Sequence, residues 1–272
     1  MEHSAGMNPV LTAVHDTPGG KIFQIIINRP EVHNCVNGQA ARLLLEAWQR
    51  FKSDDALTVA ILHGAGDRAF CSGADLTDAN TLVDPSWGDR EVEDFVRNGT
   101  GPMGGTRIIQ HKPVITMSQG YTYAGGLELF CHGHLRIAEE GATFSVACRR
   151  WGVPLADGGT VLLPRLLGLA QALPLIITGQ RIDARRAFDI GLVWEVTPRG
   201  QGLERAFSCA RQICAQPRDA LLADLSSVLE GAHLSLEKAF ELEARGIVPV
   251  CRSESLREGV ARFLSGNRNW FE

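Results

Sequence analysis

The chain has 272 residues, of which 44% are hydrophobic and 21% charged, and its formal net charge at pH 7 is -4. This composition excludes a disordered chain and supplies a core for one large domain or two small ones. The 27 basic and 31 acidic residues create no overall field that attracts a nucleic acid or an anionic membrane, so we expect neither as a partner.

The cysteines and the start of the chain bear on where the protein works. The seven cysteines are odd in number, none are spaced as CxxC, and their spacing fits no disulfide framework, which favours a reducing compartment. The chain does not begin with the basic and apolar stretches of a signal peptide, and no apolar run approaches the ~20 residues that span a bilayer. We therefore expect a soluble cytoplasmic protein.

Hydrophobic patterning alternates strands with helices until about residue 200. Short apolar runs predict strands over 22–28, 58–64, 113–120, 135–138, 142–147 and 192–196. Apolar residues at three- and four-residue spacing predict helices after Asn37, over 168–177 and over 183–190. Four further helices are predicted over 203–215, 218–230, 235–245 and 253–264. This order predicts an α/β core followed by a helical C-terminal layer.

Residues 77–106 fit neither the strand nor the helix pattern. They contain Pro85, Trp87 and Gly88, followed by the glycine-rich run GTGPMGG at 99–105. Long irregular segments in compact domains often cover binding sites. We therefore expect a mobile segment that lies over a site.

Two glycine-containing segments give the first indication of chemistry. FCSGADL (70–76) follows the strand at 58–64, and GYTYAGGLEL (120–129) follows the strand at 113–120. In the second segment a helix is expected to begin near Gly125, and the first amides of a helix have no internal partner. Two such N–H groups from neighbouring loops would form an oxyanion hole, with Glu128 about one turn away to exchange protons. The alternative is a pair of tight turns with a solvated glutamate.

Four segments resemble the signature segments of the enoyl-CoA hydratase/isomerase (crotonase) superfamily, and a fifth resembles the segment that follows them. They are INRPEVHNCVN (27–37), AFCSGADL (69–76), SQGYTYAGGLEL (118–129), GVPLADGGTVLLPRLLG (152–168) and ITGQRIDARRAFDIGLVWEV (177–196). The resemblance implies an α/β fold, with a crotonase-like ββα spiral core over residues 1–200 and a helical C-terminal trimerisation layer over 201–272. It further implies a homotrimer or homohexamer and an acyl-CoA substrate, with no cofactor beyond the coenzyme A of that substrate.

The resemblance also implies which residues bind the substrate. The family's two oxyanion-hole amides fall on Ala74 and Gly125. Loops at 33–36 and 74–77 would hold the CoA moiety, and the residues concerned are His33, Asn34, Val36, Asp75, Leu76 and Thr77. Arg29 and Arg68 are candidate neighbours of the CoA phosphates, because arginine is always ionised; the alternative for each is a solvated surface arginine.

The chain departs from the family pattern at the acid–base residues. Family hydratases use two glutamates, of which the first matches Glu128 and the second falls on Cys148. A thiol with an ordinary pKa of ~8.5 does not replace a carboxylate in this chemistry. Asp157 lies close to where relatives such as the dienoyl-CoA isomerases carry a catalytic aspartate. It is either a relocated partner of Glu128 or a cap of the turn and helix that follow it.

A metal centre is not expected. Cys131, His132 and His134 form a dense cluster, but a zinc site needs about four ligands and no distant pair has a fitting spacing. These histidines are better explained as residues at the end of a helix and in the turn after it.

The resemblance, with Glu128 as the retained glutamate, implies hydration of a 2-enoyl-CoA, with the thioester carbonyl held by Ala74 and Gly125 and the proton moved by Glu128. Double-bond isomerisation, or another enolate reaction that uses Asp157, is the alternative. A third hypothesis is a non-catalytic acyl-CoA-binding homologue, which the missing second glutamate favours and the retained Glu128 opposes.

Overall fold

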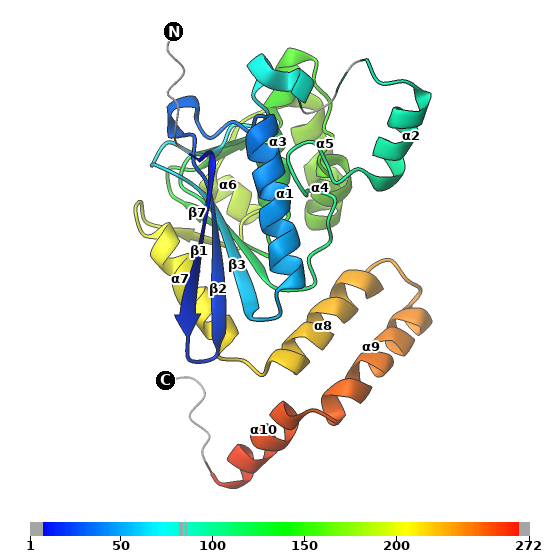
Figure 1. Cartoon of the computed structure of the whole chain (residues 1–272). Coiled ribbons are helices and arrows are strands. Elements are labelled where there is room, and N and C mark those ends of the chain that lie inside the picture. Colours follow the sequence, from blue (N-terminus) through cyan, green and yellow to red (C-terminus); the bar gives the residue numbers. More distant parts are fainter. Residues whose placement is uncertain (1–7, 82–83, 85, 267–272) are drawn as a thin grey trace.

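The computed structural model of the chain describes residues 8–81, 84 and 86–266, whose strands form two sheets (Figure 1). The larger sheet has the strand order β1-β2-β3-β5-β7-β10, and the smaller sheet has the order β4-β6-β8-β9. The strands of the larger sheet are β1 (Val10–Thr17), β2 (Gly20–Ile27), β3 (Leu57–Gly64), β5 (Val114–Ser118), β7 (Leu135–Glu139) and β10 (Glu195–Thr197). Those of the smaller sheet are β4 (Ala69–Cys71), β6 (Tyr121–Tyr123), β8 (Thr143–Ser145) and β9 (Ile182–Asp183).

Helices cover both faces of the larger sheet. β1 and β2 form an antiparallel hairpin at one edge, whereas the successive pairs from β2 to β10 are parallel. Every residue of β3 and β5 is buried, because alternate side chains pack on opposite faces. Leu62 belongs to the cluster that includes α1 (Gly38–Ser53), and Ile61 to the cluster that includes α7 (Gly202–Cys214). Burial on both faces explains why these strands read as continuous apolar runs.

The smaller sheet brings the two glycine-containing segments together. β4 and β6 pair in parallel, with Ala69 opposite Tyr121 and Cys71 opposite Thr122. The carboxyl ends of neighbouring parallel strands lie at the same edge of a sheet, so the chain that leaves β4 runs beside the chain that leaves β6. The second of these continues directly into α3 (Gly125–Cys131).

The remaining helices differ in how closely they join the sheets. α4 (Gly159–Leu167), α5 (Leu169–Thr178) and α6 (Ala184–Asp189) lie within the body, and α2 (Asp89–Asn98) stands at its periphery (Figure 1). The last three, α8 (Arg218–Gly231), α9 (Leu236–Cys251) and α10 (Glu254–Leu264), extend away from the sheets and contain no buried residue. The domain boundary at residue 200 stays a prediction, and α7, just beyond it, packs on the larger sheet.

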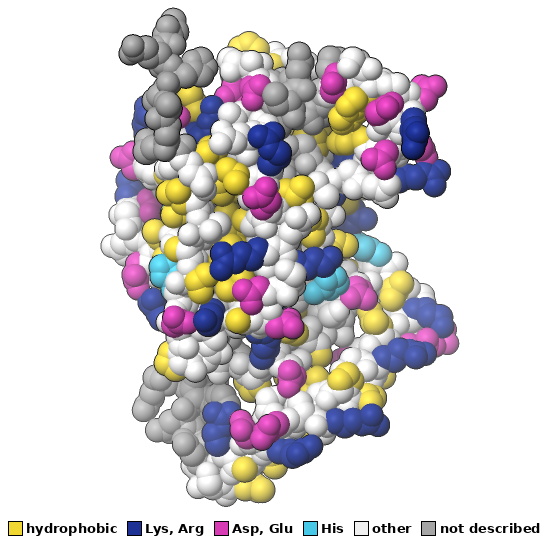
Figure 2. Space-filling model, in the orientation of Figure 1, with side chains coloured by type: hydrophobic (Ala, Val, Ile, Leu, Met, Phe, Trp, Pro, Cys, Tyr) yellow, Lys and Arg dark blue, Asp and Glu magenta, His cyan; other side chains and the backbone are white. Residues whose placement is uncertain are grey.

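The surface gives no sign of a single-sign charge patch on the face seen in Figure 2, where basic and acidic side chains are interspersed. Among the helices of the described residues, none has the length and apolar character needed to cross a membrane.

Most of the predicted elements are confirmed. β2, β3, β5, β7 and β8 overlap the predicted apolar runs, and α1, α5 to α8 and α10 match the helical patterns, whereas α9 continues beyond its predicted end at 245 to Cys251. The predicted strand at 192–196 is right only in part, because β10 begins at Glu195, and Leu192 and Val193 are buried in the turn before it.

Six elements were not predicted from the apolar patterns. β4, β6 and β9 have only two or three residues each, which is too short for an apolar run to stand out. β1 is an edge strand whose side chains are mostly exposed, and α4 contains Pro164. α2 has Val92, Phe95 and Val96 at helical spacing but buries no residue. α2 lies inside the segment 77–106, of which residues 82–83 and 85 lie outside the described residues. The end of that segment differs from the expected cover over a site, because Met103 and Thr106 are buried in the body.

Asn34 ties the loop before α1 to the loops around β4. It is buried and has a φ of 57°, a left-handed conformation that asparagine tolerates better than most residues. Its side-chain oxygen accepts a hydrogen bond from the Arg29 N–H (3.0 Å), and its amide donates to the carbonyls of Ala65 (2.9 Å) and Ala69 (2.8 Å). Asn34 therefore has a structural role within the predicted CoA-binding loop.

We predict that Asn34→Ala lowers the free energy of unfolding by about 2–4 kcal/mol, because buried polar groups lose their partners. Urea unfolding measures this change. Asn98→Ala, in the exposed face of α2, is the control and should change stability by less than about 0.5 kcal/mol. A loss for Asn34→Ala no larger than that of the control would contradict the role assigned to Asn34.

Candidate active site

The amides of Ala74 and Gly125 lie on neighbouring loops. Val36 pairs with Ala74 in a parallel bridge, in which the Val36 N–H donates to the Gly73 carbonyl (2.9 Å) and the Asp75 N–H donates to the Val36 carbonyl (2.8 Å). This pairing uses the groups on either side of Ala74, so its own N–H points away from Val36. Among the described residues, neither the Ala74 nor the Gly125 N–H donates to a protein acceptor.

Gly73 is the point at which the two loops touch. Its φ is 109°, and a Cβ at this position would lie 2.9 Å from the Ala124 Cβ and 3.3 Å from the Gly125 nitrogen. Only glycine combines this backbone conformation with so close an approach. The amide of Gly125 is the first of α3 and so has no partner within that helix. The sequence-based expectation of two N–H groups on adjacent loops agrees with this geometry.

Glu128, on the first turn of α3, is almost completely buried, with 2% of its surface exposed. Its Oε1 accepts hydrogen bonds from the N–H groups of Asp157 (2.9 Å) and Gly159 (2.7 Å). Burial, followed by the charge of Asp157, raises the pKa of Glu128 to about 7, although the peptide N–H bonds oppose the rise. A carboxyl group with this pKa can both take up and release a proton near neutral pH.

Asp157 is also buried, but its carboxylate faces a different partner. Oδ1 accepts hydrogen bonds from the Met103 N–H (2.8 Å) and from the Thr106 hydroxyl. Burial raises the pKa of this carboxyl, and the bonds from Thr106 and Met103 oppose that rise. The hypothesis that Asp157 caps the following helix is wrong, because no side chain caps α4 at Gly158 and Glu128 binds the Gly159 N–H instead.

Cys148, which the sequence resemblance matches to the family's second glutamate, lies in a short 3-10 helix over Ala147–Trp151. Its side chain is buried, and burial together with the charge of Glu128 raises the pKa of the thiol. The thiol is therefore neutral at physiological pH. Cys148 contributes an uncharged group to the surroundings of Glu128 where a hydratase of two glutamates would have a second carboxylate.

The predicted CoA-binding loops are linked by an ion pair that the sequence did not reveal. Arg29 Nη2 lies 2.9 Å from Asp75 Oδ2, and Arg29 Nη1 donates to the Cys35 carbonyl at 2.7 Å. Asp75 belongs to the loop at 74–77 and Cys35 to the loop at 33–36, so Arg29 connects the two loops. The alternative of a solvated Arg29 is therefore wrong, whereas Arg68 is exposed and donates to the Pro30 carbonyl (3.0 Å).

Of the other residues predicted to bind CoA, some are buried and some are exposed. Asn34 and Val36 are buried, so only their backbone could meet a ligand, whereas Leu76 is half-exposed. Thr77 is exposed and bonds through its hydroxyl to Asp75 Oδ1 (2.6 Å), and the His33 ring lies 5.6 Å from that of Tyr121.

The histidines after α3 have hydrogen-bonding partners in the core. His132 Nε2 donates to the Asp157 carbonyl (3.2 Å), and His134 Nδ1 accepts from the Val114 N–H (3.0 Å). Burial lowers the pKa of both rings, that of His134 to about 4, so both are neutral at pH 7. In the part of the chain that the structure describes, no three His, Cys, Asp or Glu side chains are placed to hold a metal ion.

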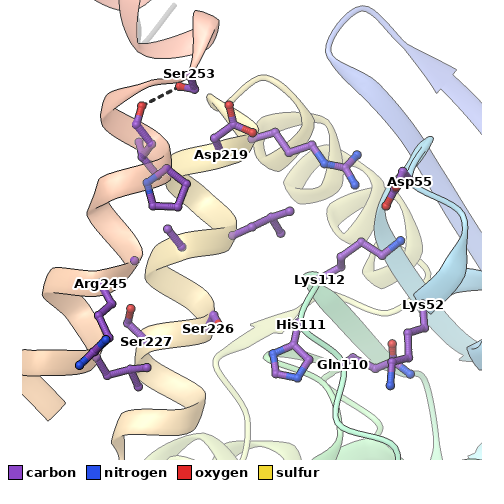
Figure 3. Close-up of a pocket in the computed structure, with 17 residues that line it drawn as sticks. Lys52, Asp55, Gln110, His111, Lys112, Asp219, Ser226, Ser227, Arg245 and Ser253 are labelled. Atoms are coloured by element: carbon purple, nitrogen blue, oxygen red, sulfur yellow. Dashed lines mark hydrogen bonds between the residues drawn. The ribbon is translucent and has the colours of Figure 1, made fainter. Parts of the chain in front are cut away.

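A cavity of about 800 Å³ lies away from these groups, between the body and the helices α8 and α9 (Figure 3). Lys112 and His111 face it from the body, and Ser226 and Arg245 from the two helices. Of the described residues that line it, none belongs to the candidate site, so the size of this cavity does not locate the chemistry.

Two site residues, Met103 and Thr106, were missed by sequence reasoning. They belong to the segment 77–106, in which no periodic pattern distinguishes buried from exposed positions. The only signal was the concentration of glycines at 99–105, of which Gly101, Gly104 and Gly105 have positive φ. These glycines allow the tight path that carries Met103 and Thr106 to Asp157.

Comparison with known proteins identifies the family and agrees with the fold. The family described as enoyl-CoA hydratase/isomerase matches residues 18–272. Enoyl-CoA hydratase EchA19 of Mycobacterium tuberculosis is 30% identical over 250 residues, 90% of each chain. The 1,2-epoxyphenylacetyl-CoA isomerase of Escherichia coli is 31% identical over 90% of this chain and 92% of its own. The crystal structure of enoyl-CoA hydratase EchA1 from Mycobacterium marinum has a TM-score of 0.82 and 31% identity, over 96% of this chain and 97% of that one.

The chain therefore belongs to the enoyl-CoA hydratase/isomerase family and has its crotonase-type α/β fold. It is an enzyme of this family, in which the named relatives include both a hydratase and an isomerase.

The charge of Asp157 supplies a test of the site's electrostatics. Since that charge raises the pKa of Glu128, Asp157→Asn should lower the Glu128 pKa from about 7 towards its ordinary value of 4.5. Titration of the Glu128 side-chain carboxyl by ¹³C NMR measures the shift, and Glu128→Gln identifies the signal. Asp183→Asn, at the start of α6, removes a charge that does not act on Glu128 and keeps a capping residue. An unchanged midpoint in Asp157→Asn would contradict the coupling.

Proposed function

We propose that the protein adds water to a 2-enoyl-CoA and that Glu128 is its acid–base group. The observation that carries the proposal is a buried carboxyl of pKa about 7 on the first turn of α3, three residues after the amide that faces the Ala74 loop. The oxyanion amides, the acid–base group and the loops suited to CoA all lie at one edge of the smaller sheet. Enoyl-CoA hydratase is also the printed name of similar proteins.

In this proposal the thioester oxygen accepts hydrogen bonds from the N–H groups of Ala74 and Gly125. Negative charge grows on that oxygen when water adds to Cβ, so both donors bind the transition state more strongly than the substrate. Glu128 takes one proton from the water molecule while the remaining hydroxyl bonds to Cβ. It then returns a proton to Cα, so one carboxyl serves both steps and the second glutamate, replaced by Cys148, is not required.

The same proposal assigns the CoA moiety to the loops at 33–36 and 74–77. The ion pair between Arg29 and Asp75 holds these loops together, which leaves backbone groups fixed for the ligand. Arg68 stands exposed beside them and is the better placed of the two arginines for a phosphate. The substrate carries the coenzyme, and the proposed reaction needs no other cofactor.

Double-bond isomerisation is the second candidate, favoured by the charge coupling between Asp157 and Glu128. Two carboxyl groups near one substrate could remove a proton from one carbon and supply one to another. In the structure Oδ1 of Asp157 accepts hydrogen bonds from Met103 and Thr106, so Oδ2 is the oxygen left to move a proton in this reaction. Hydration uses Glu128 alone and is our first choice.

We further propose that α8, α9 and α10 bind other copies of the chain, in a homotrimer or a homohexamer. These helices contain no buried residue, and they expose large apolar side chains, among them Leu236, Phe240, Ile247 and Phe263. Apolar surface of this extent on an outer layer favours a partner. A cytoplasmic location stays a prediction from the sequence.

Substitution of the acid–base residue tests the proposed reaction. Glu128→Gln should lower kcat for hydration of 2-butenoyl-CoA by roughly 100-fold or more, because the amide cannot move the proton. Loss of the enoyl-thioester absorbance measures the rate, with isomerisation of 3-enoyl-CoA assayed in parallel. Butyryl-CoA should still raise the melting temperature of the variant, which shows that binding remains. Background activity of the wild type in both assays would overturn both candidates, and unchanged hydration by Glu128→Gln would remove its assigned role.

Light scattering tests the assembly. The wild type should have the mass of three or six chains, and Phe240→Asp should lower it, because the charge would be buried in the contact. Val96→Asp places the same charge on an exposed position of α2, outside the proposed contact, and should keep the wild-type mass. A wild-type mass of one chain at micromolar concentration would contradict the proposal.

A further inference from the structure

Met103 occupies the space beside the amide proposed to hold the thioester. Only 1% of its surface is exposed, and a Cβ on Gly125 would lie 2.9 Å from both the Cγ and the Sδ of Met103. The missing side chain of Gly125 thus lets this thioether approach the start of α3. A thioester whose oxygen accepts from the Gly125 N–H would bring its acyl chain close to this side chain.

Met103 is fixed by hydrogen bonds rather than by packing alone. Its N–H donates to Asp157 Oδ1 (2.8 Å), and the Thr106 hydroxyl donates to the same oxygen. Gly101, with a φ of 96°, lies against this junction, where a Cβ would overlap the Thr106 hydroxyl and lie 3.0 Å from Asp157 Oδ1. The turn from 101 to 106 is therefore closed on the Asp157 carboxylate. We call these two hydrogen bonds the Asp157 latch.

Asp157, which holds Met103 through its side chain, also contacts Glu128 through its backbone. The Asp157 N–H donates to Glu128 Oε1 at 2.9 Å, so its backbone orients the acid–base group while its side chain holds Met103. A displacement of Met103 by a long acyl chain would pull on the peptide that orients Glu128. Short acyl chains would leave both in place.

We propose that Met103 is the residue that limits the enzyme to short-chain acyl-CoA substrates and that the Asp157 latch, through Thr106, holds it in that position. This inference rests on the proposed function. Methionine is flexible, and the burial of each further methylene of a ligand is favourable, so a methionine without the latch would yield to a longer chain. By holding Met103 in place, the Asp157 latch limits the length of the acyl chain that can bind.

The dissociation constants of saturated acyl-CoAs test the proposal without turnover. Wild-type protein should bind butyryl-CoA more tightly than octanoyl-CoA, although the longer chain is the more hydrophobic. Met103→Ala should raise the affinity for octanoyl-CoA relative to butyryl-CoA by roughly 10-fold or more, which corresponds to about two additional methylenes accommodated. Met117→Ala is the matched control: it truncates a methionine of similar burial in the cluster beneath α7 and should leave the ratio unchanged.

A second pair of variants tests the latch and serves if Met103→Ala does not fold. Thr106→Val keeps the shape but removes the hydroxyl donor, so it should raise the ratio in favour of octanoyl-CoA. Thr106→Ser keeps the donor and should retain the wild-type ratio. A merely structural role for Thr106 would lower the melting temperature and leave the ratio unchanged.

The outcomes separate this proposal from the proposed function. Wild-type protein that binds no acyl-CoA would overturn both. Wild-type protein that prefers octanoyl-CoA, or a Met103→Ala or Thr106→Val protein with the wild-type ratio, would overturn the role of Met103 and leave the proposed function intact.

Discussion

The parallel pairing of β4 with β6 is the constraint on which the candidate site depends. It places the chain after Cys71 beside the chain after Tyr123, and Gly73 permits the contact between them. The Val36–Ala74 bridge then adds a third segment to the same edge. Two short backbone pairings therefore fix the loops that carry the Ala74 and Gly125 amides, although these loops come from distant parts of the sequence. The larger sheet, buried on both faces, provides the rigid support behind them.

Glu128 holds the start of another helix through main-chain groups. Its carboxyl group binds the N–H groups of Asp157 and Gly159, where α4 begins, and so links two helices. Orphan amides at a helix start favour an anion, whereas burial and the Asp157 charge favour the neutral acid. The opposition of these effects leaves the pKa of Glu128 at about 7 instead of at either extreme. A second carboxylate at position 148 would add a negative charge and raise the pKa of Glu128 further, whereas the neutral thiol of Cys148 does not.

The sequence carries those features that depend on local pattern. Continuous apolar runs predicted the strands that are buried on both faces, and the small residues before Glu128 predicted the first amide of α3. β1 could not be predicted, because an exposed edge strand has no apolar alternation. The partners of Arg29 and Asp157 could not be predicted either. Each contact joins segments about 50 residues apart, and such pairings follow from the folded path of the chain.

The position of Asp157 between Met103 and Glu128 has a consequence for how enzymes of this kind diverge. Under the proposed function, a mutation that breaks the hydrogen bonds of the Asp157 carboxylate in order to free Met103 also disturbs the peptide that orients Glu128. Acyl-chain range and proton transfer would then be coupled through Asp157, and a change in one would call for a compensating change in the other. A library that varies the turn at 101–106 alone would recover mostly impaired catalysts, whereas variation of residues 101–106 together with 155–159 would explore new acyl groups with the proton chemistry preserved.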